Sequence, residues 1–125
     1  MRAYSGVMRQ DTATVIDAYL KAFAAKDLST APLHAEVEFE GPLGPQLKGA
    51  ATVRQVFAGF FPTVKGIRVV RHIVDGEWCA TMFNMETTFG TIPMLDCFHV
   101  VDGLIRSIRV YYDPRMILEG MSRVA

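Results

Sequence analysis

One acidic residue inside an apolar segment carries the strongest chemical signal in this sequence. Asp96 lies within residues 92–101, and its neighbours on the same face of an expected strand are Met94 and Phe98. A carboxyl group in such surroundings is exposed at an edge, paired with a base, or kept protonated by desolvation. A protonated acid can donate a hydrogen bond to negative charge that develops on a substrate oxygen. Asp96 is therefore a candidate catalytic acid, and a structural Asp that caps a turn or meets an Arg is the alternative.

Four other polar side chains are weaker candidates. Tyr19 lies on the apolar face of an expected helix, where a core tyrosine with a satisfied hydroxyl is the simpler interpretation. His34 is either a base at the mouth of a pocket or a histidine that meets the carbonyl groups of a helix end. His72 faces a pocket under only one of two possible turn registers. His99 is expected on the face of its strand opposite Asp96.

Composition and charge narrow the class of ligand. Half of the 125 residues are hydrophobic, and 13 basic residues balance 13 acidic ones, so we expect no nucleic acid as a partner. No apolar run is long enough for a signal peptide or a membrane span. Cys79 and Cys97 lie in apolar strands without metal-ligand spacing, which indicates buried thiols in a reducing compartment. We therefore expect a cytoplasmic domain with no metal and no cofactor, whose partner is a hydrophobic small molecule.

The first half of the chain is expected to be mostly helical. Apolar residues recur at helical spacing over residues 15–23, and Asp11 is the expected N-cap of that helix. Residues 31–34 predict a short second helix, because a proline is favoured in a first helical turn. Residues 37–40 alternate apolar and acidic side chains and predict a strand, and residues 50–61 predict a third helix.

The second half is expected to be a meander of antiparallel strands. Four segments rich in β-branched and aromatic residues are separated by Asp-Gly or Gly-Thr turns, which are typical of hairpins. The expected strands are residues 67–74, 77–89, 92–101 and 104–112. Helices followed by an antiparallel sheet form the α+β pattern, in which the helices cover one face of the sheet.

Strand alternation predicts which side chains face the helices. A tight turn at Gly90 puts the odd-numbered residues of the preceding strand on the same face as Asp96. A three-residue final turn would place Val110 beside Asp96, whereas a two-residue turn would place Arg109 there and make an ion pair. We prefer the first, because Val110 suits the interior better. The expected pocket-lining residues are Phe57, Phe61, Phe83, Met85, Met94, Phe98, Ile108, Val110 and Tyr112.

Several short motifs, in their order and spacing, resemble the SnoaL-like and ketosteroid-isomerase-like branch of the nuclear-transport-factor-two-like superfamily. They are the segments DAYL at 17–20, KD at 26–27, GPLG at 41–44, KG at 48–49, LDCF at 95–98 and IRVYYDP at 108–114. The order of elements matches over nearly the whole chain, so residues 1–125 are expected to form a single SnoaL-like domain. The resemblance implies a cone-shaped barrel, in which a curved, mainly antiparallel sheet wraps around the N-terminal helices and encloses an internal apolar pocket.

The resemblance also assigns roles to residues. In ketosteroid isomerases a tyrosine on the first helix and a protonated aspartic acid on a late strand bind the dienolate oxygen, and Tyr19 and Asp96 match these positions. The general base of that family is an Asp before the proline that follows the first strand, where this chain has Gly41. Glu40 is one residue away and could serve only if a bulge turned it toward the pocket. An Asp of limonene-epoxide-hydrolase-like relatives corresponds to Val110, which argues against epoxide hydrolysis.

The leading hypothesis is a small cofactor-free enzyme for a hydrophobic, polycyclic or polyketide-like molecule. Tyr19 and Asp96 would donate hydrogen bonds to an enolate-like oxygen, and Glu40 or His34 would move the proton during isomerisation, cyclisation or dehydration. The alternative is a non-catalytic binding protein of the same fold, which would need no base.

Apolar side chains are also expected on the outer face of the sheet. They are Trp78, Met82, Ile105 and Tyr111, with His99 beside them. An exposed apolar patch of this kind usually marks an interface. We therefore predict a homodimer that forms through this face.

Overall fold

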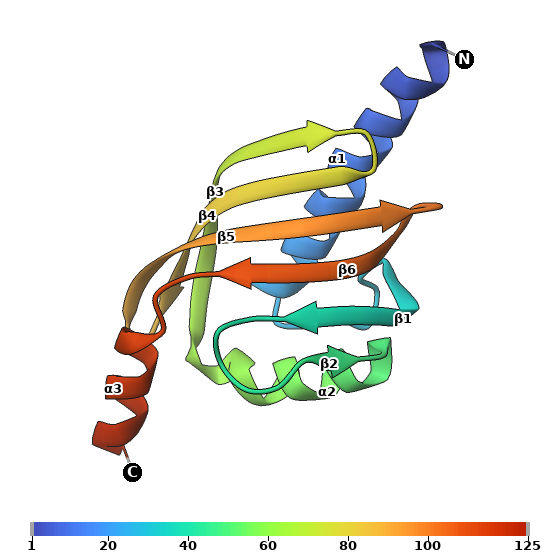
Figure 1. Cartoon of the computed structure of the whole chain (residues 1–125). Coiled ribbons are helices and arrows are strands. Elements are labelled where there is room, and N and C mark those ends of the chain that lie inside the picture. The colour runs from blue at the N-terminus through green and yellow to red at the C-terminus, as the bar shows by residue number, and fades with distance from the viewer. Residues whose placement is uncertain (1, 125) are drawn as a thin grey trace.

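A curved sheet is the frame on which the rest of the chain is built (Figure 1). The computed structural model describes the backbone of residues 2–124 and the side chains of residues 12–123, and within them six strands lie in the order β2-β1-β6-β5-β4-β3. All neighbouring strands are antiparallel except β1 and β6, which are parallel. The strands are β1 (Leu33–Glu40), β2 (Leu47–Lys48), β3 (Val64–Asp75), β4 (Trp78–Thr87), β5 (Gly90–Val101) and β6 (Leu104–Tyr111).

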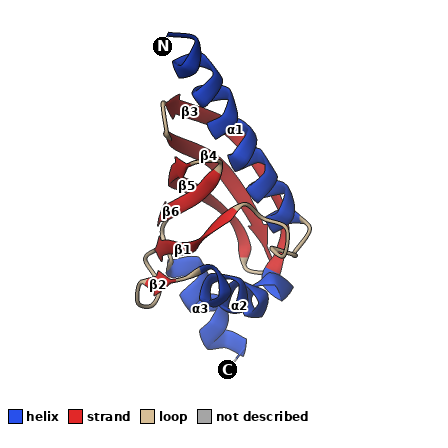
Figure 2. Ribbon diagram, turned by 90° about the vertical axis from the view of Figure 1, so that its right-hand side faces the viewer, coloured by secondary structure: helices blue, strands red, loops and turns tan. Residues whose placement is uncertain are grey.

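Two helices cover the concave face of this sheet, which confirms the predicted α+β class (Figure 2). α1 (Arg2–Ala24) runs diagonally across the inner face of β3 to β6, and α2 (Ala50–Phe60) lies below it beside β1 and β2. A short 3-10 turn, Phe61–Thr63, continues α2 and contains Pro62. The sheet is curved but does not close on itself. The core between the layers includes Ile16, Tyr19, Leu20, Phe23, Val53, Phe57, Phe83, Phe98 and Ile108.

Alternation along β4 and β5 agrees with the predicted faces. In β4 the odd-numbered residues from Cys79 to Thr87 are buried, while Trp78, Met82 and Glu86 are exposed. Antiparallel pairing sets Thr81 opposite Asp96, so both side chains point toward the helices. The inner face of the sheet is therefore the one that carries the candidate acid.

The final hairpin sets Val110 beside Asp96, as we preferred, but through a different turn. Asp102 and Gly103 have φ values of 52° and 76°, as in a two-residue type I′ turn, rather than the three-residue turn that we expected. A β-bulge at Arg106 adds one residue to β6, and this extra residue restores the pairing of Val110 with Asp96. Val110 therefore lies beside Asp96 as predicted, and the bulge is the reason.

The same bulge corrects one prediction for the outer face. Ile105 pairs with Val100 and is fully buried on the inner face, whereas we expected it outside. Beyond the bulge His99 pairs with Ser107, so the alternation of β6 changes phase at this point.

Two predictions for the helices need correction. α1 begins at Arg2, and Asp11 lies inside it rather than at its N-cap. Residues 31–34 do not form a helix, because Leu33 already pairs with β6 and the carbonyl oxygen of Pro32 accepts a hydrogen bond from the Ile105 N–H at 2.8 Å. Pairing with a neighbouring strand outweighs the local preference there.

The C-terminal helix α3 (Arg115–Val124) was not expected from the sequence. It lies against the sheet at the end where β6 finishes (Figure 1). Ile117 is buried, and a Cβ at Gly120 would overlap the ring of Phe89, so this glycine permits close packing. No helix among the described residues has the length and apolar character that crossing a membrane requires.

Candidate functional site

An apolar cavity of about 170 Å³ lies between α1, α2 and the sheet. Six of the nine predicted pocket residues line it, and so do both predicted hydrogen-bond donors, Tyr19 and Asp96. The six are Phe57, Phe83, Met85, Met94, Val110 and Tyr112. The structure therefore brings together residues from the first helix, the second helix and three strands.

The other three predicted pocket residues are core residues. Phe61, Phe98 and Ile108 are buried but do not line the cavity, and the Phe98 ring instead packs edge-on against Tyr19 at a centroid distance of 5.5 Å. The prediction missed seven lining residues, most of which belong to the apolar stripes of the two helices. They are Leu20, Phe23, Phe39, Leu43, Val56, Phe60 and Ile67.

Asp96 is a buried acid without a cationic side chain as its partner. It is only 4% exposed, and its Oδ1 has no hydrogen-bond partner among the described residues. Arg109, the alternative partner, lies on the other face of β6, where its Nη2 is 2.8 Å from Glu40 Oε1. Desolvation by burial raises the pKa of Asp96 to about 8. The carboxyl group is therefore protonated at neutral pH and can donate a hydrogen bond.

Two tyrosines share the cavity with this acid. Burial raises the pKa of Tyr19 well above its usual value, and the negative charge that Asp96 would carry raises it further. The pKa of Tyr112, which is half-buried, is raised by the same two causes. Both phenol groups are therefore protonated, and both lie close enough to Asp96 for its charge to affect their pKa. The remaining lining residues are aliphatic, aromatic or Met.

The two candidate bases lie outside the cavity. His34 is on β1, and its Nδ1 accepts a hydrogen bond from the Glu36 N–H at 3.0 Å. Glu40 is exposed in its ion pair with Arg109, because strand alternation turns Phe39 into the cavity and Glu40 away from it. β1 is irregular between Leu33 and Glu38, and this irregularity does not turn Glu40 inward.

Position 41 lies beside two residues that line the cavity, but it carries no side chain. A Cβ on Gly41 would lie 3.6 Å from the ring of Phe39 and 3.8 Å from the Cβ of Val110, and both of these residues line the cavity. These are ordinary van der Waals distances. There is room for a side chain at the position where the resemblance places the general base.

The other two histidines have structural surroundings. His72 points from β3 toward α1, where it bonds Asp17 and Thr81 rather than lining the cavity. His99 lies on the outer face as predicted, stacked on Trp78 with ring centroids 4.1 Å apart, and its Nε2 is 3.2 Å from Glu77 Oε1. Among the side chains that the structure describes, no three His, Cys, Asp or Glu residues are grouped to hold a metal ion.

Comparisons with known proteins agree with this fold. A family model described as the SnoaL-like domain matches residues 16–108. A protein of known structure from Kribbella flavida is 22% identical, with a TM-score of 0.80 over 88% of this chain and 93% of its own. A steroid delta-isomerase from Pseudomonas aeruginosa is 21% identical, with a TM-score of 0.72 over 90% of each chain.

A further solved structure extends the range of similar proteins. An LEH-like epoxide hydrolase from M. tuberculosis is 20% identical, with a TM-score of 0.72 over 92% of each chain. No curated protein matches the chain. At these identities the solved structures establish the fold, and the site has to be judged on its own residues.

The protonated state of Asp96 predicts a pH dependence of stability. Its folded-state pKa of about 8 lies above the value of about 3.9 for an unfolded Asp, so protonation favours folding. This contribution is fully present below about pH 4 and is lost as the pH rises through about 8. In urea titrations from about pH 5 to about pH 8, the free energy of unfolding of the wild type should fall relative to that of Asp96→Asn, by a few kcal/mol in all.

Asp113→Asn is the matched control for this measurement. Asp113 is exposed, and hydrogen bonds from Arg115 lower its pKa, so it is ionised over the whole range in both states. Its replacement should leave the shape of the pH profile unchanged. Parallel profiles for the wild type and Asp96→Asn would show that Asp96 is ionised in the folded protein.

Proposed function

This chain belongs to the SnoaL-like family, and on that premise we propose that it is a cofactor-free enzyme for acid-base chemistry on a small hydrophobic carbonyl compound. Tyr19 and Asp96 donate hydrogen bonds to the oxygen on which negative charge develops during isomerisation, cyclisation or dehydration. One observation carries the proposal. The protonated carboxyl group of Asp96 has no hydrogen-bond partner among the described residues, and it faces an apolar cavity.

The apolar lining supports this role for the two donors. Hydrogen bonds to a charged oxygen are stronger in a site of low polarity than in water, because little solvent competes for the donors. Burial keeps both Tyr19 and Asp96 protonated at neutral pH. In other enzymes the loss of one such donor lowers the rate about 10²-fold to 10³-fold. A pair of this kind therefore stabilises an enolate more strongly than the parent ketone, because the enolate oxygen carries the greater negative charge.

The volume of the cavity limits what it can enclose. About 170 Å³ is close to the size of an engineered cavity of about 150 Å³ that admits benzene. One ring of the substrate therefore fits beside the donors. Val56 and Phe60 are partly exposed lining residues, so a larger molecule extends past them into solvent. For a polycyclic substrate, the enclosed part is the terminal ring that carries the oxygen.

A proton acceptor is the missing part of this enzyme. We assign the role to Glu40, which borders a surface hollow that shares Val110 and Tyr112 with the cavity. From there a carboxylate acts on the substrate through a bridging water. His34 offers no comparable route, since its ring bonds the backbone of its own strand.

A non-catalytic binding protein is the second candidate function. It is favoured by the cavity lining, which among the described residues provides donors and no side chain that is basic at neutral pH. The same donors would hold the oxygen of a phenol, enol or ketone without turnover.

For either function we propose a cytoplasmic location. It suits the two cysteines, which form no disulfide: Cys79 lies in the core, and Cys97 is partly exposed on the outer face.

Binding of 2-naphthol tests the donor pair. Its hydroxyl oxygen should meet Tyr19 and Asp96, whereas naphthalene has the same rings and no hydroxyl. The wild type should bind 2-naphthol about tenfold more tightly than naphthalene, because one or two buried hydrogen bonds separate the two ligands. Tyr19→Phe and Asp96→Leu should each reduce this ratio severalfold in calorimetric titrations at about pH 7.

Phe57→Leu is the control for lost packing. Phe57 lines the cavity without a polar group, so its replacement should weaken both ligands and leave the ratio of their affinities unchanged. Equal ratios for the wild type, Tyr19→Phe and Asp96→Leu would rule out the donor pair.

Gly41→Asp tests whether the site can serve isomerisation. The added carboxylate should take a proton from the carbon next to the carbonyl of 3-cyclohexenone, whose oxygen the donors hold, and return it to the far end of the dienolate. We expect the formation of 2-cyclohexenone, followed by ultraviolet absorbance, to be about 10²-fold faster than with Gly41→Asn. The Asn variant has the same shape and supplies no base.

The same assay separates the two candidate functions. A wild-type rate above that of buffer, lost in Asp96→Leu, supports the enzyme, and binding without turnover supports the binding protein. Gly41→Asp no faster than Gly41→Asn would contradict the placement of the substrate oxygen at Tyr19 and Asp96.

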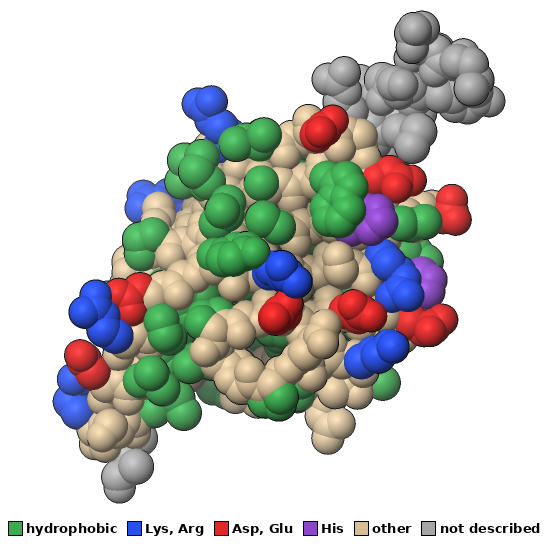
Figure 3. Space-filling model, viewed as in Figure 1, with side chains coloured by type: hydrophobic (Ala, Val, Ile, Leu, Met, Phe, Trp, Pro, Cys, Tyr) green, Lys and Arg blue, Asp and Glu red, His purple; other side chains and the backbone are tan. Residues whose placement is uncertain are grey.

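We also propose that the protein forms a homodimer through the outer face of the sheet. Trp78 and Tyr111 are 55% and 50% exposed there, and other apolar side chains lie across the same face among charged ones (Figure 3). Large exposed aromatic side chains are enriched at interfaces. This face is on the side opposite the helices, so pairing leaves the cavity open to ligand.

Trp78→Glu should disrupt this dimer. Light scattering at micromolar concentration should give the wild type twice the 13.9 kDa mass of one chain and give the variant a lower mass. Leu118→Glu is the control, since Leu118 is 50% exposed on α3, away from this face. A monomeric wild type would contradict the proposal.

A further inference from the structure

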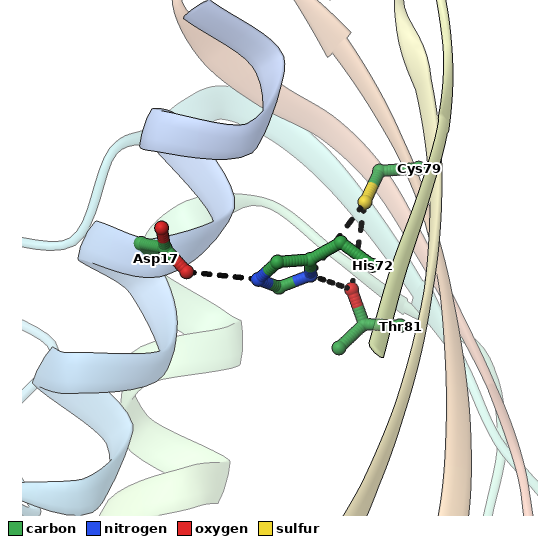
Figure 4. Close-up of polar contacts among 4 residues, drawn as sticks. All are labelled: Asp17, His72, Cys79 and Thr81. Carbon is green, nitrogen blue, oxygen red and sulfur yellow. Dashed lines mark hydrogen bonds and ion pairs between the residues drawn. The ribbon is translucent and has the colours of Figure 1, made fainter. Parts of the chain in front are cut away.

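A second polar cluster lies between α1 and the sheet, outside the cavity (Figure 4). His72 Nε2 donates a hydrogen bond to Asp17 Oδ1 at 2.8 Å, and His72 Nδ1 is 2.8 Å from Thr81 Oγ1. The Sγ of Cys79 is 3.5 Å from the same hydroxyl oxygen. A single imidazole ring therefore joins the helix to β3 and β4.

Each end of this cluster is linked to one of the two donors, Asp17 through α1 and Thr81 through its pairing with Asp96. Asp17 precedes Tyr19 by two residues on α1, so the two side chains leave the helix on nearly opposite sides. Thr81 is the direct cross-strand neighbour of Asp96, so their Cβ atoms are about 5 Å apart on one face. The path through His72 connects the helix that carries one donor to the strand beside the other.

The rotation of α1 about its own axis decides where the Tyr19 hydroxyl lies. The buried face of α1 is held mainly by apolar contacts, which have no preferred direction. A turn of about 20° moves an atom that is about 6 Å from a helix axis by about 2 Å. Such a displacement is enough to break a hydrogen bond. A directional contact is therefore needed to aim the phenol group.

We propose that His72 is a positioning residue, whose bonds to Asp17 and Thr81 fix the rotation of α1 so that Tyr19 and Asp96 reach the same ligand oxygen. The inference rests on the proposed function, since the alignment matters only if both donors bind one oxygen. Burial supports it, because Thr81 is 0% exposed and its hydroxyl depends on protein partners. The other end of the path, Asp17, has a side chain that is 58% exposed.

Asp17→Ala tests the proposal without endangering the fold. Asp17 is exposed and lies inside a helix, where Ala is the most favourable residue, so the variant should fold. It should lower the ratio of 2-naphthol to naphthalene affinity about fivefold, because the donors no longer converge. Asp17→Asn keeps an acceptor for His72 Nε2 and should retain most of the ratio. Lys21→Ala, an exposed change on the same helix, should have no effect.

A double-mutant cycle separates positioning from general stability. If His72 acts through the Tyr19 hydroxyl, Asp17→Ala should reduce the ratio in the wild type and have little further effect once Tyr19→Phe is present. A merely structural contact would lower the affinity for both ligands and leave their ratio unchanged. His72→Leu should behave like Asp17→Ala, with near-ultraviolet circular dichroism to check that it is folded.

The outcomes distinguish this inference from the proposed function. If Tyr19→Phe lowers the ratio but Asp17→Ala does not, or if Asp17→Ala is equally harmful with and without the hydroxyl, the positioning role is overturned and the donor pair stands. If Tyr19→Phe leaves the ratio unchanged, the donor pair fails and the positioning role fails with it.

Discussion

An unpaired carboxyl group inside an apolar cavity is the constraint on which the site depends. Ionised Asp96 would lose several kcal/mol of hydration without a partner to offset the loss, so the folded protein keeps the proton. A cationic partner for Asp96 lies nearby, because Arg109 is the cross-strand neighbour of Cys97, the residue next to Asp96. Strand alternation keeps that guanidinium on the opposite face of the sheet, where it bonds Glu40.

One extra residue in β6 decides between these two chemistries. Without the bulge at Arg106, the two-residue turn at Asp102 and Gly103 would bring Arg109 to the inner face, opposite Asp96. The result would be a buried ion pair and an ionised carboxylate, which accepts hydrogen bonds and donates none. Because of the bulge, Asp96 is a hydrogen-bond donor and not one half of a buried salt bridge. Bulges are local irregularities that often occur beside functional sites.

The sequence predicts the parts of this fold that follow from a simple period. Strands with a period of two fix which side chains meet, and on that basis the apolar surroundings of Asp96 and the outward turn of His99 are confirmed. Val110 also points inward as predicted, but the bulge in β6 is the reason and not the turn that we expected. The errors lie where contacts distant in sequence decide. Leu33 joins a strand because β6 is available to pair with it, and the bulge in β6 leaves no mark in the composition of the hairpin.

For the candidate site too, the sequence identifies single residues but not the contacts between distant segments that arrange them. A tyrosine on an apolar helix face and an acid in an apolar strand can each be identified from the sequence as a possible donor, but only the packed structure places both of them in one cavity. α1 carries one donor and β5 the other, and these elements meet through an apolar interface that does not fix direction. Polar contacts between α1 and the β3–β4 hairpin supply that direction, because Thr12 Oγ1 donates a hydrogen bond to the carbonyl oxygen of Gly76 and His72 Nε2 donates one to Asp17 Oδ1. In the proposed function, the alignment of the two donors therefore depends on side chains that do not line the cavity.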